Sequence, residues 1–336
     1  MKYILYIILF CNCTLILGQS NIEYFDNEVI QNNKIFLLGE SHGIKSNFII
    51  AKEMMKELKE KTNFKYFLAE NDLAVGVLLN EAINKKDTVR LKEIILKFYD
   101  SPSRCIEKYD FYKYIIELNN EYEDDIQILG VDIAAAGIQF SKEVLEKTED
   151  SFIKEYLKKN WEHTKIAFKA PDSDWDKIRD AYIIENFKEL TKKYQLDEEV
   201  FFGVWGASHT YKSEARDVDW FAQGLVEDGK KVYSIVQYYI NSMRMTPWHF
   251  SKKSPDGECF VFNKFTNFSG KDLRKYKKEV EKGGFKLVKK IDDLKIGNFI
   301  DGKKVKNKLS DYIDAIIIVN ESDATTVLGS NVCEKQ

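Results

Sequence analysis

Short apolar segments that end abruptly in an ionisable side chain constrain the fold of this chain. The first segment, residues 35–38, leads directly into the sequence GESHG, which carries Glu40 and His42. Four apolar residues are too few for a helix, and an apolar run without alternation is typical of a parallel strand buried on both faces. In open α/β sheets, ligands bind beyond the carboxyl ends of the strands. The segment therefore predicts both a buried strand and the position of a functional site.

The same pattern recurs along the chain. Apolar segments at 64–70, 126–132 and 200–209 each end in a carboxylate or an imidazole. Two further apolar segments, at 231–239 and 314–320, complete the predicted sheet. Strands that are continuously apolar need cover on both sides. We therefore predict an α/β fold with a mostly parallel sheet and helices on both faces.

The ionisable groups at the segment ends are expected to converge in one site. Glu40, His42, Glu70, Asp132 and His209 all follow buried segments, where an unpaired charge is costly. Each has a structural alternative when taken alone. Glu40 or Glu70 could cap a helix, Asp132 could form a turn, and His209 could be a hydrogen-bonded core histidine. The repetition favours convergence over four separate structural roles.

Helical segments separate the predicted strands. A helix with one apolar stripe is predicted over residues 46–61, and helical insertions at about 73–123 and 140–194 are predicted to form a cap over the strand ends. In the second insertion, Arg179 and Asn186 are seven residues apart and therefore share a helix face. An arginine among apolar neighbours needs either an anionic ligand or a carboxylate partner within the cap.

The first twenty residues have the composition of a secretory signal peptide. One lysine precedes a charge-free apolar stretch that ends in small residues. This stretch is interrupted by the sequence CNC and falls short of the roughly 20 apolar residues of a membrane span. We expect residues 1–20 to be removed and residues 21–336 to form a single α/β domain, secreted or periplasmic. No later segment predicts a stable membrane span.

Charge and motif content limit the classes of ligand. The chain has 51 basic and 54 acidic residues and no basic stripe, so nucleic acid is not an expected partner. The three cysteines left after removal of the leader, Cys105, Cys259 and Cys333, are far apart and odd in number, which disfavours a disulfide framework or a thiolate metal site. Residues 251–306 alternate apolar runs with lysine-rich stretches and predict only a solvated face. A small-molecule substrate remains the expected partner.

Several motifs follow one another in a fixed order. They are Gly39, Glu40, His42 and Gly43 in the opening, Glu70 at a strand end, Gly130 with Asp132, Arg179, Asp180, Glu185 and Asn186 on one helix, Trp205, Gly206 and His209 at the fourth strand, and Tyr312, Asp314 and Ala315 near the end. In this order they resemble the erythromycin esterase family and its wider superfamily, which includes haem-binding lipoproteins and metal-dependent proteases built on G-x-x-H. The opening has one residue between glutamate and histidine where the family has two, and the fourth strand keeps one of two histidines. The resemblance implies an α/β fold and hydrolytic activity.

The leading functional hypothesis is a hydrolase that cleaves an ester or related acyl bond with activated water. His42 would act as general base, because an imidazole suits proton abstraction near neutral pH. Glu40 or Glu70 would orient it, and His209 and Arg179 would stabilise the oxyanion or hold a substrate carboxylate. The residues expected to contact substrate are Asp132, Asn186, Trp205 and Ser41.

Two other hypotheses use the same side chains. In one, a divalent metal such as zinc is bound by His42, His209 and Glu70, with Glu40 or Asp132 as further ligands, in a metal-dependent hydrolase or peptidase. In the other, the chain is a binding protein for haem or another bulky apolar ligand, and a histidine is the axial ligand. No cofactor is otherwise indicated.

Overall fold

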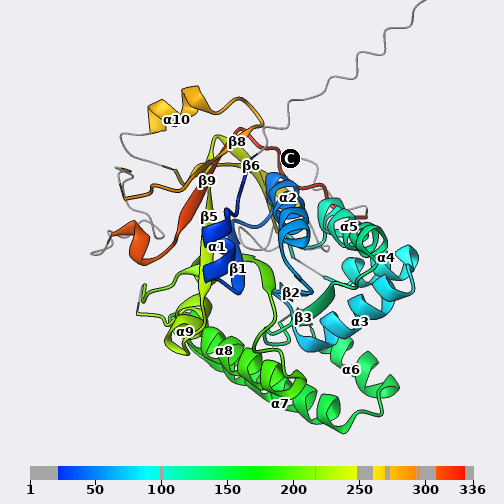
Figure 1. The fold of residues 1–336 in the computed structure, drawn as a ribbon. Coiled ribbons are helices and arrows are strands. Elements are labelled where there is room, and N and C mark those ends of the chain that lie inside the picture. Colours follow the sequence, from blue (N-terminus) through cyan, green and yellow to red (C-terminus); the bar gives the residue numbers. More distant parts are fainter. Residues whose placement is uncertain are drawn as a thin grey trace, which may run out of the picture.

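The computed structural model describes residues 22–98, 101–135, 137–215, 217–247, 260–268, 273–292, 294 and 308–329. The predicted leader, Cys259 and Cys333 lie outside these residues. The main sheet has the strand order β3-β2-β4-β1-β5-β9-β8 (Figure 1), and all neighbours are parallel except the edge pair β8 and β9. The predicted α/β fold with a mostly parallel sheet is therefore confirmed.

The elements follow the predicted segments closely. The strands of the main sheet are β1 (Ile35–Glu40), β2 (Tyr66–Ala69), β3 (Gln127–Gly130), β4 (Phe201–Gly206), β5 (Val232–Ile240), β8 (Phe285–Val288) and β9 (Ala315–Asn320). A separate antiparallel hairpin consists of β6 (Ser242–Pro247) and β7 (Phe260–Phe265). The helices are α1 (Asn27–Asn32), α2 (Ser46–Lys61), α3 (Leu73–Asn84), α4 (Thr88–Leu96), α5 (Ile106–Tyr122), α6 (Ile138–Lys147), α7 (Ser151–Lys169), α8 (Trp175–Tyr194), α9 (Phe221–Glu227) and α10 (Leu273–Glu279), with short 3-10 turns η1 (Ala207–Thr210) and η3 (Leu309–Asp311).

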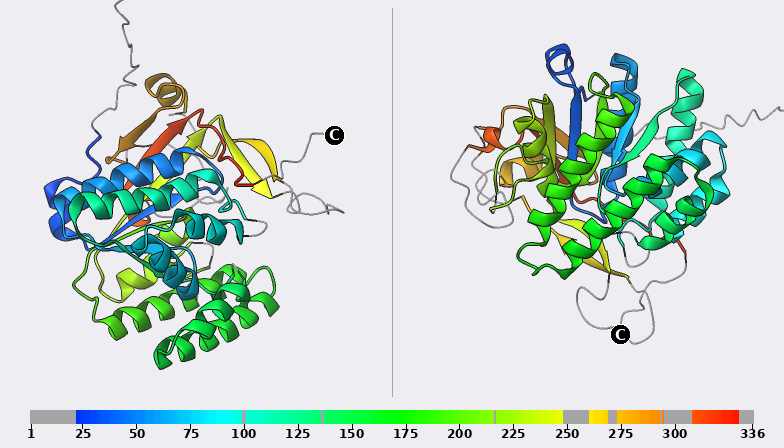
Figure 2. Two further views of the ribbon diagram at one scale, coloured as in Figure 1. Left: turned by 90° about the vertical axis from the view of Figure 1, so that its right-hand side faces the viewer. Right: turned by 90° about the horizontal axis from the view of Figure 1, so that it is seen from below.

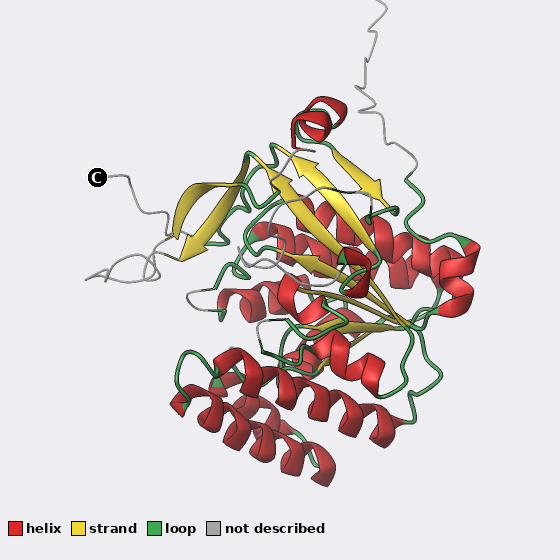
Figure 3. Ribbon diagram, turned by 90° about the vertical axis from the view of Figure 1, so that its left-hand side faces the viewer, coloured by secondary structure: helices red, strands yellow, loops and turns green. Residues whose placement is uncertain are grey.

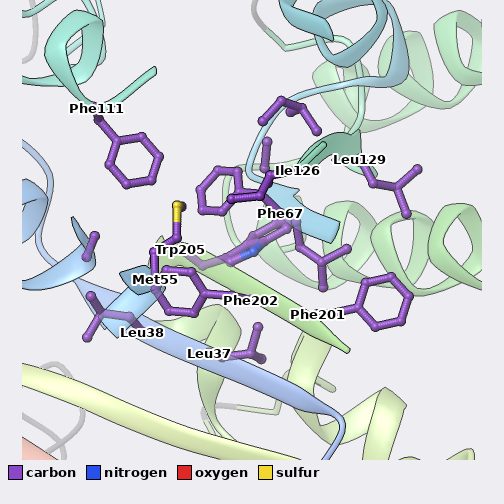
Figure 4. Packing of buried hydrophobic residues seen from close by; sticks show 14 of the residues in the cluster. Leu37, Leu38, Met55, Phe67, Phe111, Ile126, Leu129, Phe201, Phe202 and Trp205 are labelled. Atoms are coloured by element: carbon purple, nitrogen blue, oxygen red, sulfur yellow. The ribbon is translucent and has the colours of Figure 1, made fainter. Parts of the chain in front are cut away.

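Alternating side chains of each strand pack against helices on opposite faces of the sheet. Phe202 in β4 packs against Phe67, which contacts Phe111 of α5. Its neighbour Phe201 points the other way, toward Phe187 of α8 (Figure 4). Figures 2 and 3 show the result, with α2 and α5 on one face of the sheet and α7 and α8 on the other. This two-sided cover explains why the strands are continuously apolar.

The strand order creates a crevice at the centre of the sheet. From β1 the chain passes through α2 to β2, whereas from β4 it passes through α9 to β5 on the far side of β1. The connections that leave the neighbouring strands β1 and β4 therefore run in opposite directions along the sheet, which opens space beyond the carboxyl ends of these strands. This topological switch point is where ligands bind in open α/β sheets.

Helix α3 packs directly onto β3 through Gly130. A Cβ at Gly130 would lie 2.0 Å from the carbonyl oxygen of Asp72, the residue that caps α3. We expect Gly130→Ala to lower the free energy of unfolding in urea by about 1–3 kcal/mol, because the backbone of α3 must move away. An unchanged urea midpoint would contradict this close approach.

None of the described helices combines the length and the apolar character required to cross a bilayer.

Candidate active site

A cavity of about 400 Å³ lies beyond the carboxyl ends of β1, β2 and β3. The ionisable residues that line it are Glu40, His42, Glu70, Lys108, Asp132 and Arg179. Its aromatic wall consists of Phe48, Phe67, Phe98, Phe111, Tyr112 and Trp175. The cavity therefore joins a charged floor at the strand ends to an apolar chamber between α2, α5 and the start of α8.

His42 is held at the cavity by the last residue of β1. Its Nδ1 donates to one carboxylate oxygen of Glu40, and 48% of its side chain is exposed. The other Glu40 oxygen accepts from the Asn47 side-chain amide, whose oxygen accepts from the Tyr239 hydroxyl at 2.7 Å. The carboxylate is thus fixed by α2 and β5, and it fixes the imidazole in turn, with Nε2 left available in the cavity.

The loop after His42 is clamped by backbone contacts. Gly43 has φ +86°, and a Cβ there would lie 2.1 Å from the carbonyl oxygen of Met245 in β6. The Gly43 carbonyl accepts from the backbone N–H groups of Met245 at 2.9 Å and Thr325 at 3.0 Å. Only glycine fits this left-handed, closely packed position without strain.

The segment that follows β9, residues 321–329, is called the C-terminal strap here because it ties two cavity walls together. Lys45, just before α2, donates its backbone N–H to Asp323 at 2.9 Å. At the start of α5, the N–H of Ile106 donates to Thr326 at 2.8 Å. The strap therefore holds the His42 loop and the amino end of α5 in one frame.

Arg179 of α8 joins the ends of β2 and β3. Its Nε donates to Asp132 at 3.0 Å, and its Nη2 donates to the other Asp132 oxygen and to Glu70 at 2.9 Å. Its Nη1 donates to His209 Nε2 at 3.1 Å. Four of the five guanidinium N–H groups are therefore engaged, and one on Nη1 remains.

His209 lies behind this pair and does not line the cavity. Its side chain is buried, and its Nδ1 contacts Asp180 at 2.9 Å. In the neutral ring, Nδ1–H donates to Asp180 while Nε2 accepts from Arg179. Burial has the largest effect on the pKa of His209 and lowers it, and the charge of Arg179 lowers it further; the charge and hydrogen bond of Asp180 together with the charge of Glu70 outweigh both and raise this pKa. The structure places His209 as a support for Arg179.

Opposite charges set the protonation of the two groups nearest the cavity. Burial alone would lower the pKa of His42, but the carboxylates of Glu40 and Glu70 outweigh it and raise this pKa to about 9. Burial alone would raise the pKa of Glu70, but His42, Arg179 and His209 hold it well below its usual range. At neutral pH the site therefore contains an imidazolium between two carboxylates.

Most of the predicted site residues meet around one oxygen atom. Glu70 Oε1 lies 3.8 Å from His42 Nε2, 3.6 Å from His209 Nε2 and 2.9 Å from Arg179 Nη2. Since Asp132 shares Arg179, the strand-end groups form one cluster, and Arg179 reaches it from α8.

Three predicted substrate contacts lie elsewhere. Asn186 is buried and donates to the carbonyl of Val131 at 3.1 Å, so it supports the end of β3. Trp205 is buried against Phe221 of α9. Ser41 lies outside the cavity lining, and its N–H donates to the Tyr239 hydroxyl.

The sequence GESHG also fits the G-x-S-x-G pattern of serine esterases. In those enzymes the serine sits on a strained turn between strand and helix. Ser41 follows β1, but its φ is not positive and Ser41 does not line the cavity. The structure therefore presents His42, and not Ser41, to a substrate.

Three residues of the site were not predicted. Asn47 and Tyr239 anchor Glu40, and Lys108 of α5 lines the cavity wall. Asn47 lies on the same buried stripe of α2 as Ile50 and Ala51. A polar residue on an apolar stripe was the available signal for Asn47.

The residues present do not fit a bound divalent metal. No group of three acidic, histidine or cysteine side chains among the described residues is arranged to hold an ion. Of the three predicted ligands, His209 and Glu70 each accept a hydrogen bond from an Nη atom of Arg179, so a cation already occupies the place between them, and His42 reaches this group only through Glu70.

His209 does not suit an axial haem ligand, because its Nε2 accepts from Arg179 and its Nδ1 contacts Asp180. His42 would have to lose a proton before it could ligate iron, since its pKa is raised to about 9.

Comparison with known proteins agrees on the fold. No protein-family model and no curated protein matches the sequence. Three solved structures each align with a TM-score of 0.62: a Bacillus cereus protein (13% identity; 90% of this chain and 91% of that chain), a histidine-to-asparagine mutant of the erythromycin esterase EreC in its open conformation (12%; 90% and 94%), and a succinoglycan biosynthesis protein (15%; 89% and 91%). At these identities the likeness shows the fold alone. The chain therefore shares its fold with an erythromycin esterase.

Proposed function

We propose that the protein is a hydrolase that cleaves an ester or related acyl bond with a water molecule activated by His42. The observation that carries this proposal is the Glu40–His42 pair at the cavity. Glu40 is fixed by Asn47 and accepts from Nδ1, so the opposite nitrogen of a half-exposed imidazole is free to take a proton. A carboxylate that orients an imidazole is the usual arrangement of a general base.

The side chains can carry both steps of a hydrolysis. Nε2 of neutral His42 takes a proton as the water oxygen bonds to the substrate carbonyl carbon, and Glu40 stabilises the resulting imidazolium. The remaining N–H of Arg179 can donate to the oxyanion. The imidazolium then returns its proton to the leaving oxygen as the acyl bond breaks. The fold shared with an erythromycin esterase supports this class of reaction. The leader predicted at residues 1–20 would place the activity outside the cytoplasm.

We expect the rate of hydrolysis to rise with pH. With a pKa of about 9, only about one His42 in a hundred carries the free base near pH 7. For 4-nitrophenyl acetate, corrected for reaction with hydroxide, kcat/KM should increase nearly tenfold per unit from about pH 7 to about pH 8.5 and level off above about pH 9. A rate that falls over this interval would show that the imidazolium is the working form.

Glu70→Gln tests the origin of this pH dependence. The substitution removes one of the two charges that raise the pKa of His42. The inflection of the rate profile should therefore move to lower pH by about one unit. His163→Gln is the control, because His163 stacks on Tyr182 away from the cavity. An inflection that stays in place in Glu70→Gln would assign it to another group.

A further inference from the structure

Lys108 and Arg179 both line the cavity, but they differ in the side chains that they contact. Arg179 is bound by Asp132 and Glu70. Among the described residues, no acidic side chain forms an ion pair with Lys108, whose ammonium instead donates to Ser103 Oγ at 2.9 Å and lies 5.2 Å from the Phe98 ring centroid. Glu40 and Glu70 act on this ammonium only from a distance, and a partly buried ammonium without a carboxylate in contact is an uncommon arrangement.

Ser103 adds a second donor beside Lys108. An ammonium can only donate, so the Ser103 oxygen is the acceptor of their hydrogen bond, and the hydroxyl proton remains available. Both residues line the cavity. Two adjacent donors, one of them charged, match the two oxygens of a carboxylate.

The backbone that carries this pair is fixed before any ligand binds. The N–H of Lys108 donates to Cys105 Sγ, and the buried Cys105 pairs with Val327 of the C-terminal strap. Burial lowers the pKa of Lys108, so a bound carboxylate would also favour its charged form. Preorganised donors lose little freedom on binding.

We propose that the substrate carries a carboxylate that binds Lys108 and Ser103, with an apolar, preferably aromatic, body between this group and the acyl bond at His42. The inference rests on the proposed hydrolase function for the position of the acyl bond. Phe98 and Phe111 line the same cavity as His42 and Lys108 and supply an aromatic wall for this body. Arg179 is unsuited to select the anion, because its charge is already matched by Asp132 and Glu70.

Binding of phenylacetate and of its neutral counterpart phenylacetamide, measured by titration calorimetry, tests this inference. The wild-type chain should bind phenylacetate about tenfold more tightly, since the ion pair with the Lys108 ammonium is replaced in the amide by a hydrogen bond to a neutral carbonyl. Lys108→Met should remove this preference and leave phenylacetamide binding within about twofold. Lys113→Met, on the same helix but paired with Asp110 at the surface, should change neither.

The outcomes separate the two proposals. A wild-type chain that does not prefer phenylacetate, or a preference that survives in Lys108→Met, overturns the carboxylate site. Equal losses for both ligands in Lys108→Met also overturn it, because the cavity itself would then be damaged. The titration needs no turnover. A chain that binds phenylacetate through Lys108 but hydrolyses no ester therefore contradicts the hydrolase function alone.

Discussion

His42→Ala is expected to lower kcat/KM for ester hydrolysis by about a thousandfold, the middle of the range for loss of a general base, while the melting temperature at about pH 10, where the His42 ring is neutral and its ion pairs no longer add stability, changes by no more than about 2 °C. The large loss follows from the position of the ring, which is the only imidazole among the described residues that lines the cavity. The small change in stability follows from its exposure, since the half-exposed side chain contributes little to the core.

Two controls distinguish catalysis from structure in this variant. His163→Ala removes a histidine that packs on Tyr182 and should keep the full rate. Added imidazole should restore part of the rate to His42→Ala, because a small base can enter the space left by the side chain, and should not accelerate the wild type. A variant that mainly unfolds, or that keeps more than about a tenth of the wild-type rate, would make His42 structural.

Arg179→Met should abolish hydrolysis and also destabilise the fold. Removal of the guanidinium leaves the buried carboxylates of Glu70 and Asp132 without their shared partner, and the loss of one member of a buried ion pair costs roughly 3–5 kcal/mol. In thermal unfolding this should lower the melting temperature by about 10 °C. The effect combines two roles, because the same side chain positions the floor of the cavity and offers its last N–H to the oxyanion.

A surface lysine variant and a double variant serve as controls for the loss of stability in Arg179→Met. Lys159 is paired with Glu185 and Glu189 at the surface, so Lys159→Met should cost less than about 1 kcal/mol. Adding Asp132→Asn to Arg179→Met should recover part of the stability, since one unpaired charge disappears. If Arg179→Met were no more harmful than Lys159→Met, the buried cluster would not depend on the guanidinium.

The strands and the cluster at their ends could be predicted because burial leaves a strong trace in sequence. Parallel strands buried on both faces are continuously apolar, and the ionisable residue that follows marks the sheet edge. Glu40, Glu70 and Asp132 therefore came together as expected, since parallel strands in register end on the same side. The helix predicted over residues 46–61 has the bounds of α2 for the same reason, as its apolar stripe covers that sheet.

The missed features depend on packing that no single segment encodes. Strand β8 is a half-exposed edge strand that pairs with β9, and in the lysine-rich region its short pattern resembles a solvated face. The role of Lys108 depends on how α5 lies over the sheet. The position of His209 behind Arg179 depends on Asp180, one residue along α8, which turns the imidazole away from the cavity. These features depend on tertiary packing, and the local sequence does not distinguish them.

The position of the C-terminal strap implies that activity is lost before the fold when the chain is shortened from its carboxyl end. Residues 321–329 come after the last strand, so their removal spares every strand of the sheet. They hold Gly43, Lys45 and Ile106 by backbone hydrogen bonds, however, and these positions frame His42 and the start of α5. Carboxypeptidase trimming into the strap would therefore yield a chain that keeps its circular dichroism but has lost the alignment of its histidine, so a fold assay would pass material that an activity assay rejects.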